Sequence, residues 1–226
     1  VFFIMEKGSE KSKLTDFRRE ICQRHITGTD YRFVEADSPA WNRNEGEYGS
    51  TIGKLNRDKQ AIFEWMVFEE LADGETGAFL VWGDPSLYDS TIRIIDAMAQ
   101  GSEHQIELEI IPGISSVQAL AAKHHTTLNS IGRPVEITTG RRLAGGFPSN
   151  TDSVVVMLDA DDSYRQFADQ DIDIYWGAYL GTADEILIAG KLGDVAEKIR
   201  DVRSEARKAN GWIMDTYLLR RNDRQE

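Results

Sequence analysis

Two short motifs combine glycine and proline with oxygen-bearing side chains, each directly after an apolar run. Trp82-Gly83-Asp84-Pro85-Ser86-Leu87-Tyr88 follows residues 78–81, and Pro112-Gly113-Ile114-Ser115-Ser116 follows residues 106–111. Glycine lets the backbone approach a ligand closely, and free amide groups collect where a strand leads into a helix. The two motifs therefore indicate a binding site for a small molecule, built largely from backbone groups.

Each motif also has a purely structural interpretation. Gly83-Asp84-Pro85 is compatible with an ordinary turn between a strand and a helix, and Ser115 or Ser116 is a suitable helix N-cap. If the two preceding strands are neighbours in a parallel sheet, both turns face the same crevice at its carboxyl edge. The pair is therefore more specific for a ligand site than either motif alone.

The order of the expected elements favours an α/β fold. In the first half, strands alternate with amphipathic helices, as in a parallel sheet. We expect these strands at 1–5, 31–35, 78–82 and 106–111, and these helices at 14–25, 62–71, 88–99 and 117–123. The polar, glycine-containing residues 36–56 are predicted to form a long loop.

The second half has a different pattern. Closely spaced strands are expected at 135–138, 153–158, 172–179, 185–189 and 212–219, with one long helix at 194–208. This spacing predicts a second α/β domain with a mixed sheet. We place the N-terminal domain at 1–130 and the C-terminal domain at 135–226.

Composition excludes several classes of protein. The 226 residues carry a formal charge of −12, which argues against nucleic-acid binding through the overall field. Cys22 is the single cysteine, so no internal disulfide and no cysteine-rich metal site can form, and a cytoplasmic location is the simplest interpretation. No apolar run is long enough to span a bilayer, and no signal peptide is recognised, so we expect a soluble protein without a membrane partner.

No metal site is predicted either. His124-His125 has no acidic or histidine partner at the helical spacing that zinc ligands need. Asp159, Asp161 and Asp162 resemble the start of a calcium loop, but the required glycine and the distal glutamate are missing. We therefore expect these three aspartates to lie in a solvated turn.

Longer runs around the two motifs resemble a known family. Residues 79–91, 111–121 and Val154-Val155-Val156-Met157 are similar to the tetrapyrrole methylases, two-domain enzymes that bind S-adenosylmethionine in a cleft between their domains. Residues 137–143, 176–181 and 211–218 resemble the deacetylating precorrin-6A synthase branch of that family. The family begins with a strand and a glycine-rich turn without a counterpart before Val1, so the resemblance implies that this first strand is missing from the sequence.

The resemblance implies a methyltransferase that converts precorrin-5 to precorrin-6A with release of acetate in cobalamin biosynthesis. S-adenosylmethionine would be the methyl donor, S-adenosylhomocysteine its product, and a homodimer the assembly. There are two alternatives to this function. The protein could be a methyltransferase for another precorrin position, or a non-catalytic carrier of the tetrapyrrole or of S-adenosylmethionine. The resemblance implies that S-adenosylmethionine is bound by Trp82, Gly83, Asp84, Leu87, Ser115, Ser116, Met157 and Gly181.

Two further pairs of residues are assigned by chemical type. Removing an acetyl group requires a base for water and a donor to the oxyanion, and Asp84 and Tyr88 are the catalytic candidates. Arg141 and Arg142 suit the carboxylates of a precorrin because arginine presents a planar fork of donors. The alternatives are plain surface charges for the arginines and core packing for Met157.

Overall fold

The computed structural model describes residues 1–6, 12–39 and 48–222. The chain divides into two compact units, Val1–Gly113 and Ile114–Glu226. Helix α4 (Ser116–Lys123) groups with the second unit, whereas the expected domain limit at residue 130 assigned it to the first.

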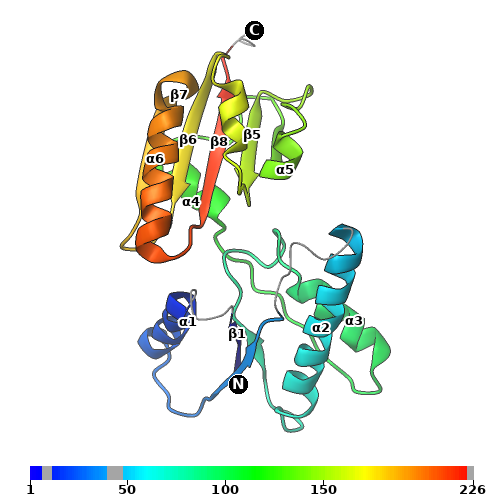
Figure 1. Ribbon diagram of the computed structural model, residues 1–226. Helices are drawn as coiled ribbons and strands as arrows, with labels where there is room; N and C mark the ends of the chain where they lie inside the picture. The colour runs from blue at the N-terminus through cyan, green and yellow to red at the C-terminus, as the bar shows by residue number, and fades with distance from the viewer. Residues whose placement is uncertain (7–11, 40–47, 223–226) are drawn as a thin grey trace. The chain divides into compact units, whose positions relative to one another are not determined.

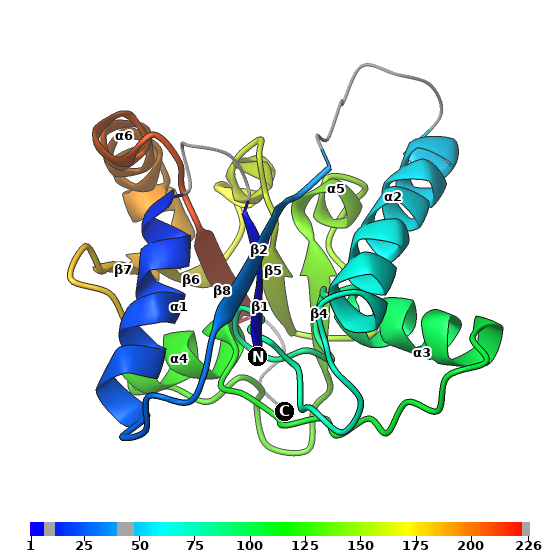
Figure 2. The same ribbon diagram turned by 90° about the horizontal axis from the view of Figure 1, so that it is seen from below.

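The first unit contains a parallel sheet with the strand order β2-β1-β3. Its strands are β1 (Phe2–Glu6), β2 (Phe33–Asp37) and β3 (Ala78–Phe79), and Phe2 of β1 pairs with Phe33 on one side and Ala78 on the other. Helix α1 (Ser12–His25) lies on one side of the sheet, and α2 (Tyr48–Phe68) and α3 (Thr91–Gly101) lie on the other (Figure 2). This confirms the predicted parallel arrangement.

The apolar positions explain why these elements form. Phe3 and Ile4 of β1 are buried, as a strand covered on both faces requires. The core between the sheet and α2 and α3 is made of Phe3, Val34, Phe63, Met66, Ile94, Ile95 and Met98. The rings of Phe63 and Phe79 stack with their centroids 4.3 Å apart, which joins α2 to the end of β3.

Three predictions for the first unit are wrong. Residues 106–111 do not form a strand, because no strand that the structure describes pairs with them and a strand needs a hydrogen-bonded neighbour. Strand β3 is only two residues long for the same reason, since it pairs with β1 at two positions. The expected loop 36–56 is helical from Tyr48 onward, because adding turns to a packed helix offsets the cost of its glycines. Residues 40–47 of that loop lie outside the described residues.

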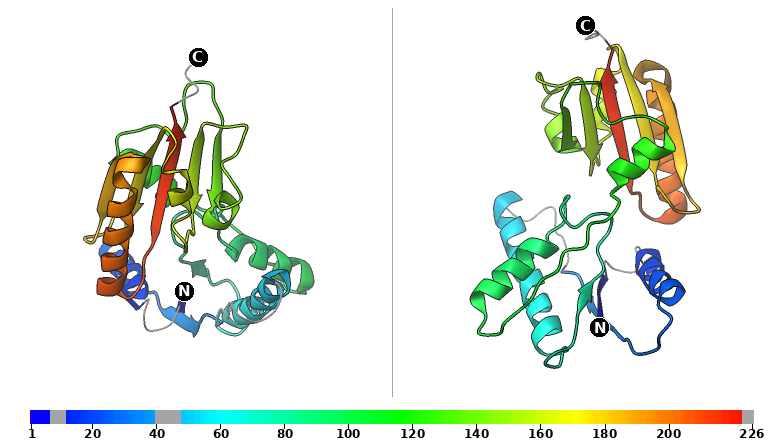
Figure 3. Two further views of the ribbon diagram at one scale, coloured as in Figure 1. Left: turned by 45° about the horizontal axis from the view of Figure 1, so that its top comes forward. Right: turned by 180° about the vertical axis from the view of Figure 1, so that it is seen from behind.

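The second unit contains the predicted mixed sheet, with the order β4-β5-β8-β6-β7. Its strands are β4 (Val135–Thr139), β5 (Ser153–Met157), β6 (Ile172–Ala178), β7 (Ile186–Lys191) and β8 (Asp215–Arg221). Strands β4 and β5 are parallel, and every other pair is antiparallel. Helices α4 and α6 (Leu192–Asn210) lie on opposite faces of this sheet (Figures 1 and 3).

The register of this sheet brings several loop regions to one edge. Thr139 pairs with Met157, Met157 with Thr216, and Ala178 with Asp215. The ends of β4, β5 and β6 and the start of β8 therefore share this edge. Helix α5 (Gly140–Leu143) and the 3₁₀ helix η2 (Ser163–Phe167) follow β4 and β5 there.

Candidate functional site

The two glycine motifs are in direct contact through Asp84 and Gly113, both of the first unit. The Asp84 carboxylate accepts hydrogen bonds from the Gly113 amide at 2.8 Å, from the Ser86 amide at 2.9 Å, and from the Ser86 hydroxyl. These donors, the Ser86 hydroxyl first, lower the pKa of Asp84 below its ordinary value. Asp84 is therefore ionised at neutral pH and joins two motifs that lie 29 residues apart.

Glycine is needed at this junction for steric reasons. A Cβ atom on Gly113 would lie 2.1 Å from the carbonyl oxygen of Gly83, closer than real Cβ contacts occur. Gly83 itself has a φ of +69°, in the left-handed region that favours glycine. We call the contact among Gly83, Asp84 and Gly113 the glycine junction.

Trp82, which precedes the glycine junction, has a buried indole N–H group. The Trp82 Nε1 atom is buried and has no hydrogen-bond partner among the residues that the structure describes. The Arg18 guanidinium, which no sequence motif indicated, lies 5.1 Å from the Trp82 ring centroid. Leu87 is half-buried, with its amide donating to the Asp84 carbonyl at 3.2 Å, and Tyr88 is exposed with a φ of +53°.

Ser115 has a structural role that the sequence analysis left open. It is the N-cap of α4, its hydroxyl accepts from the Val117 amide at 3.2 Å, and its own amide donates to the Gln118 side chain at 3.0 Å. This is a capping box, and the Ser115 side chain is buried. Ser116 is the first residue of α4 and is half-buried. That Ser115 or Ser116 contacts S-adenosylmethionine stays a prediction.

Four predicted site residues of the second unit, Met157, Gly181, Arg141 and Arg142, lie at or just after the sheet edge described above. Met157 ends β5, Gly181 follows β6 with a φ of +80°, and Arg141 and Arg142 lie in α5 after β4. The Gly181 amide donates to Glu185 at 2.8 Å. The parallel pairing of β4 with β5 thus brings the arginine segment beside the Met157 segment.

Both arginines line an open depression of about 530 Å³. Their side chains are exposed, so charged groups of a ligand can reach them. The remaining lining residues are Glu136, Thr138, Leu143, Gly145, Gly146, Pro148, Ser149 and Asn150. The depression carries the two positive charges of the arginines and the one negative charge of Glu136, in a chain of strongly negative net charge.

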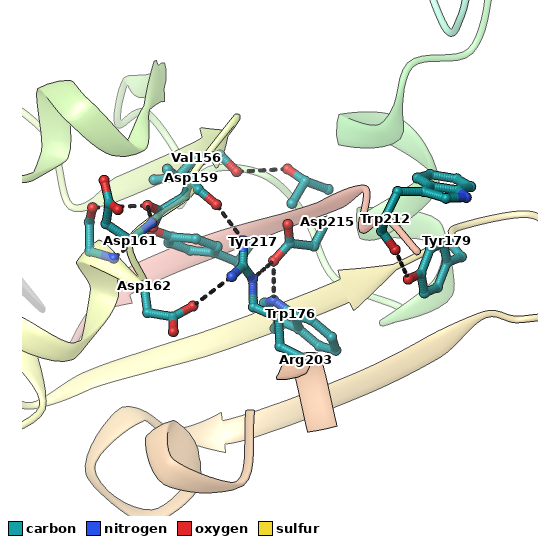
Figure 4. A network of polar contacts seen from close by, with 12 residues as sticks. Val156, Asp159, Asp161, Asp162, Trp176, Tyr179, Arg203, Trp212, Asp215 and Tyr217 are labelled. Atoms are coloured by element: carbon teal, nitrogen blue, oxygen red, sulfur yellow. Dashed lines mark hydrogen bonds and ion pairs between the residues drawn. The ribbon is translucent and has the colours of Figure 1, made fainter. Parts of the chain in front are cut away.

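Asp159 does not lie in a solvated turn, so this prediction is wrong. Its side chain is buried, and its carboxylate accepts from the Tyr217 hydroxyl at 2.6 Å and from the Ser163 amide at 2.7 Å (Figure 4). Burial of a carboxylate requires such donors. The sequence offered no signal for this contact, because Tyr217 is 58 residues away on another strand.

The structure adds two negative observations. Within residues 1–6, 12–39 and 48–222, no cluster of three or more histidine, cysteine or acidic side chains could hold a metal ion. In the same part of the chain, no helix combines the length and the apolar character needed to cross a membrane.

Comparison with known proteins agrees with the fold and with the motifs. The family pattern of the tetrapyrrole (corrin/porphyrin) methylases matches residues 8–196. A precorrin-6A synthase [deacetylating] from Sinorhizobium sp is 47% identical over 222 residues, which cover 98% of this chain and 85% of that protein.

Solved structures extend the comparison. A cobalamin synthesis related protein, CobF, from Corynebacterium diphtheriae has a TM-score of 0.81 and 32% identity, covering 97% of this chain and 86% of its own. The methyltransferase CobJ shares the fold, with a TM-score of 0.52 and 12% identity over 92% of this chain and 82% of its own. The α/β fold with one parallel and one mixed sheet is thereby confirmed. From its fold, its glycine motifs and these similarities, the chain belongs to the tetrapyrrole (corrin/porphyrin) methylases.

Proposed function

We propose that the protein is an S-adenosylmethionine-dependent C-methyltransferase that converts precorrin-5 to precorrin-6A and releases acetate. The observation that carries this proposal is the 47% identity, over nearly the whole chain, to a precorrin-6A synthase of the deacetylating type. The glycine junction supports it, because it brings two glycine-containing loops, one of them following β3, into direct backbone contact.

The residues of the glycine junction fit the methyl donor. The buried Trp82 Nε1, which has no hydrogen-bond partner among the described residues, can donate a hydrogen bond, and the exposed backbone of Gly83 and Gly113 can be approached closely by a ligand. The ionised Asp84 carboxylate can attract the ammonium group of S-adenosylmethionine. We propose that these residues, with Leu87, Ser115 and Ser116, contact the donor.

Met157 and Gly181 complete the proposed set of donor contacts. When bound, S-adenosylmethionine supplies an electrophilic methyl group on its sulfonium. Apolar atoms such as those of Met157 can surround this group without competing as nucleophiles, and transfer needs mainly an in-line position. The expected cleft between the two domains stays a prediction.

We propose that Arg141 and Arg142 hold carboxylates of the precorrin. The depression that they line is too small for a whole tetrapyrrole, but it has room for carboxylate side chains. Replacing both arginines by alanine should raise KM for precorrin about tenfold or more, with kcat little changed. Arg133→Ala, an exposed arginine before β4 that is outside the depression, is the matched control.

Release of acetate needs proton transfer, and Asp84 and Tyr88 stay our candidates. The lowered pKa of Asp84 makes its carboxylate a weak base, so it is better suited to orient water than to remove a proton. Tyr88 is exposed beside the glycine junction, where its hydroxyl can donate to an oxyanion. Tyr88→Phe should therefore allow methylation and slow the loss of the acetyl group.

Mass spectrometry of the product tests the proposed reaction. Incubation with precorrin-5 and S-adenosylmethionine should give a product that has gained a methyl group and lost an acetyl group. A product that has only gained a methyl group would indicate another precorrin position. Donor binding without turnover would indicate a carrier. Either outcome would refute the proposed reaction.

We further propose a cytoplasmic homodimer. The location is supported by the single cysteine and the assembly by the family resemblance. Light scattering of the purified protein should give the mass of two chains, and the mass of one chain would contradict this proposal.

A further inference from the structure

Leu158 holds a strained backbone conformation beside the proposed donor site. It follows Met157 at the end of β5, has a φ of +55°, and leaves 69% of its surface exposed. A leucine in the left-handed region is unfavourable unless its surroundings impose it. Because the side chain is largely exposed, packing around it does not explain the conformation.

The next residue explains how this conformation is held. Both oxygens of the Asp159 carboxylate are bonded: Oδ2 accepts from Tyr217 and from the Ser163 amide, and Oδ1 accepts from the Asp161 amide and the Ser163 hydroxyl, both at 3.0 Å. The Asp159 carbonyl accepts from the Arg203 guanidinium at 2.6 Å. Hydrogen bonds therefore hold both the side chain and the backbone carbonyl of Asp159.

Arg203 is itself anchored. It reaches from α6 toward β8, where its Nε donates to Asp215 at 2.8 Å, and Trp176 Nε1 donates to the same carboxylate oxygen at 3.0 Å (Figure 4). Burial alone would lower the pKa of Arg203, but the neighbouring carboxylates, Asp215 foremost, raise it. Arg203 therefore stays charged and holds the Asp159 carbonyl.

Asp159 also fixes the neighbouring arginine segment. A Cβ atom on Gly140 would lie 2.3 Å from Asp159 Oδ1, so the start of α5 packs directly against this carboxylate. Met157 and Leu158 precede Asp159, and Arg141 and Arg142 follow Gly140. One buried carboxylate thus sets the position of two proposed ligand segments, the one at Met157 and the one at Arg141 and Arg142.

We propose that Asp159, with Tyr217 and Arg203, is a positioning residue that holds the Met157-Leu158 turn in the geometry that binds S-adenosylmethionine. We call these three residues the Asp159 clamp. The inference rests on the proposed function, and it goes beyond it by assigning donor affinity to residues that do not touch the donor.

Tyr217→Phe tests the clamp, because it removes one hydrogen bond to Asp159 and keeps the buried ring. Tyr164→Phe is the matched control. The two tyrosine rings pack edge to face at 5.4 Å, both are buried, and the Tyr164 hydroxyl has no partner in the described part of the chain. Both variants lose a buried hydroxyl, but only one loses a contact with Asp159.

We expect Tyr217→Phe in the full-length protein to bind S-adenosylmethionine about tenfold more weakly by titration calorimetry, equivalent to about 1.4 kcal/mol. The KM for the donor should rise by the same factor, with kcat at saturating donor within about twofold. Tyr164→Phe should bind like the wild type. Adding Leu158→Gly to Tyr217→Phe should recover most of the affinity, because glycine adopts this φ without strain.

Each other result has a definite meaning. Unchanged donor affinity in Tyr217→Phe, an equal loss in Tyr164→Phe, or no recovery with Leu158→Gly would overturn the clamp and leave the proposed function intact. A wild-type protein that does not bind S-adenosylmethionine would instead refute the proposed function, and the clamp's role with it.

Discussion

Replacing Gly113 by alanine tests the contact at the glycine junction. The new Cβ would lie 2.1 Å from the Gly83 carbonyl oxygen, whereas real Cβ atoms essentially never come closer than 3.0 Å. Since the obstructing atom is backbone, the two segments must separate by about 1 Å. This movement would also stretch the 2.8 Å hydrogen bond from the Gly113 amide to Asp84.

The size of the effect follows from this displacement. Overpacking costs about 1–3 kcal/mol in a tight core, and both glycines are exposed, so the junction can open and the cost should be about 1–2 kcal/mol. For a chain of this length, that predicts a Tm lower by roughly 2–8 °C. A displacement of about 1 Å beside a ligand can reduce its productive binding by 10- to 100-fold.

Calorimetric titration with S-adenosylmethionine and thermal unfolding measure the two effects. Gly28→Ala is the control, because its Cβ would meet nothing within 4 Å and its φ needs no glycine. That control should keep the donor affinity and the Tm of the wild type. If Gly113→Ala does the same, the backbone contact with Gly83 does not exist in solution and the argument for the junction fails.

Three further predictions concern single side chains. Ser115→Ala should lower the free energy of unfolding by about 1 kcal/mol in urea titrations, because it removes the cap of α4. Ser115→Asp should restore this free energy, and equal stability of all three proteins would contradict the capping role. The pKa of Asp84 in the folded protein is below its ordinary value of 3.8. Its carboxylate therefore stabilises the folded state at pH values above 3.8, and this stabilisation is lost as the pH falls through the lower, folded-state pKa. The stability difference between wild type and Asp84→Asn should therefore be constant from about pH 5 to 8 and shrink only in stronger acid; a change near neutrality would show that Asp84 titrates elsewhere. Arg203→Met should cost about 3–5 kcal/mol of unfolding free energy, because the buried Asp215 loses its cation, and a loss below about 1 kcal/mol would argue against a buried pair.

Local patterns were sufficient for most of the secondary structure. The run Val154-Val155-Val156 belongs to the strand predicted at 153–158, and the structure confirms it as part of β5, where all three side chains are buried. Helix α6 was predicted at 194–208 and observed at Leu192–Asn210, with an apolar stripe facing the sheet. Such elements are predictable because their periodicity reflects which side of the backbone is buried.

Pairing between distant segments could not be predicted in the same way. Residues 106–111 alternate glutamate with Ile and Leu, which is typical of a strand, yet Ile111 is 74% exposed and no described strand pairs with this segment. Likewise, Ser115 or Ser116 was suitable as a cap, with a ligand contact as the alternative, and the observed hydroxyl bonds of Ser115 to Val117 and Gln118 assign it to the cap of the helix.

Residue types at short spacing were sufficient to predict the fold class, the family and the two glycine motifs. The three-dimensional contacts were needed to show that Gly113 touches Gly83, that Asp159 is buried against Tyr217, and that Arg203 donates to the Asp159 carbonyl. The contact across 58 residues depends on strand order and register, the contact across 29 residues depends on where two loops meet, and no local pattern encodes either.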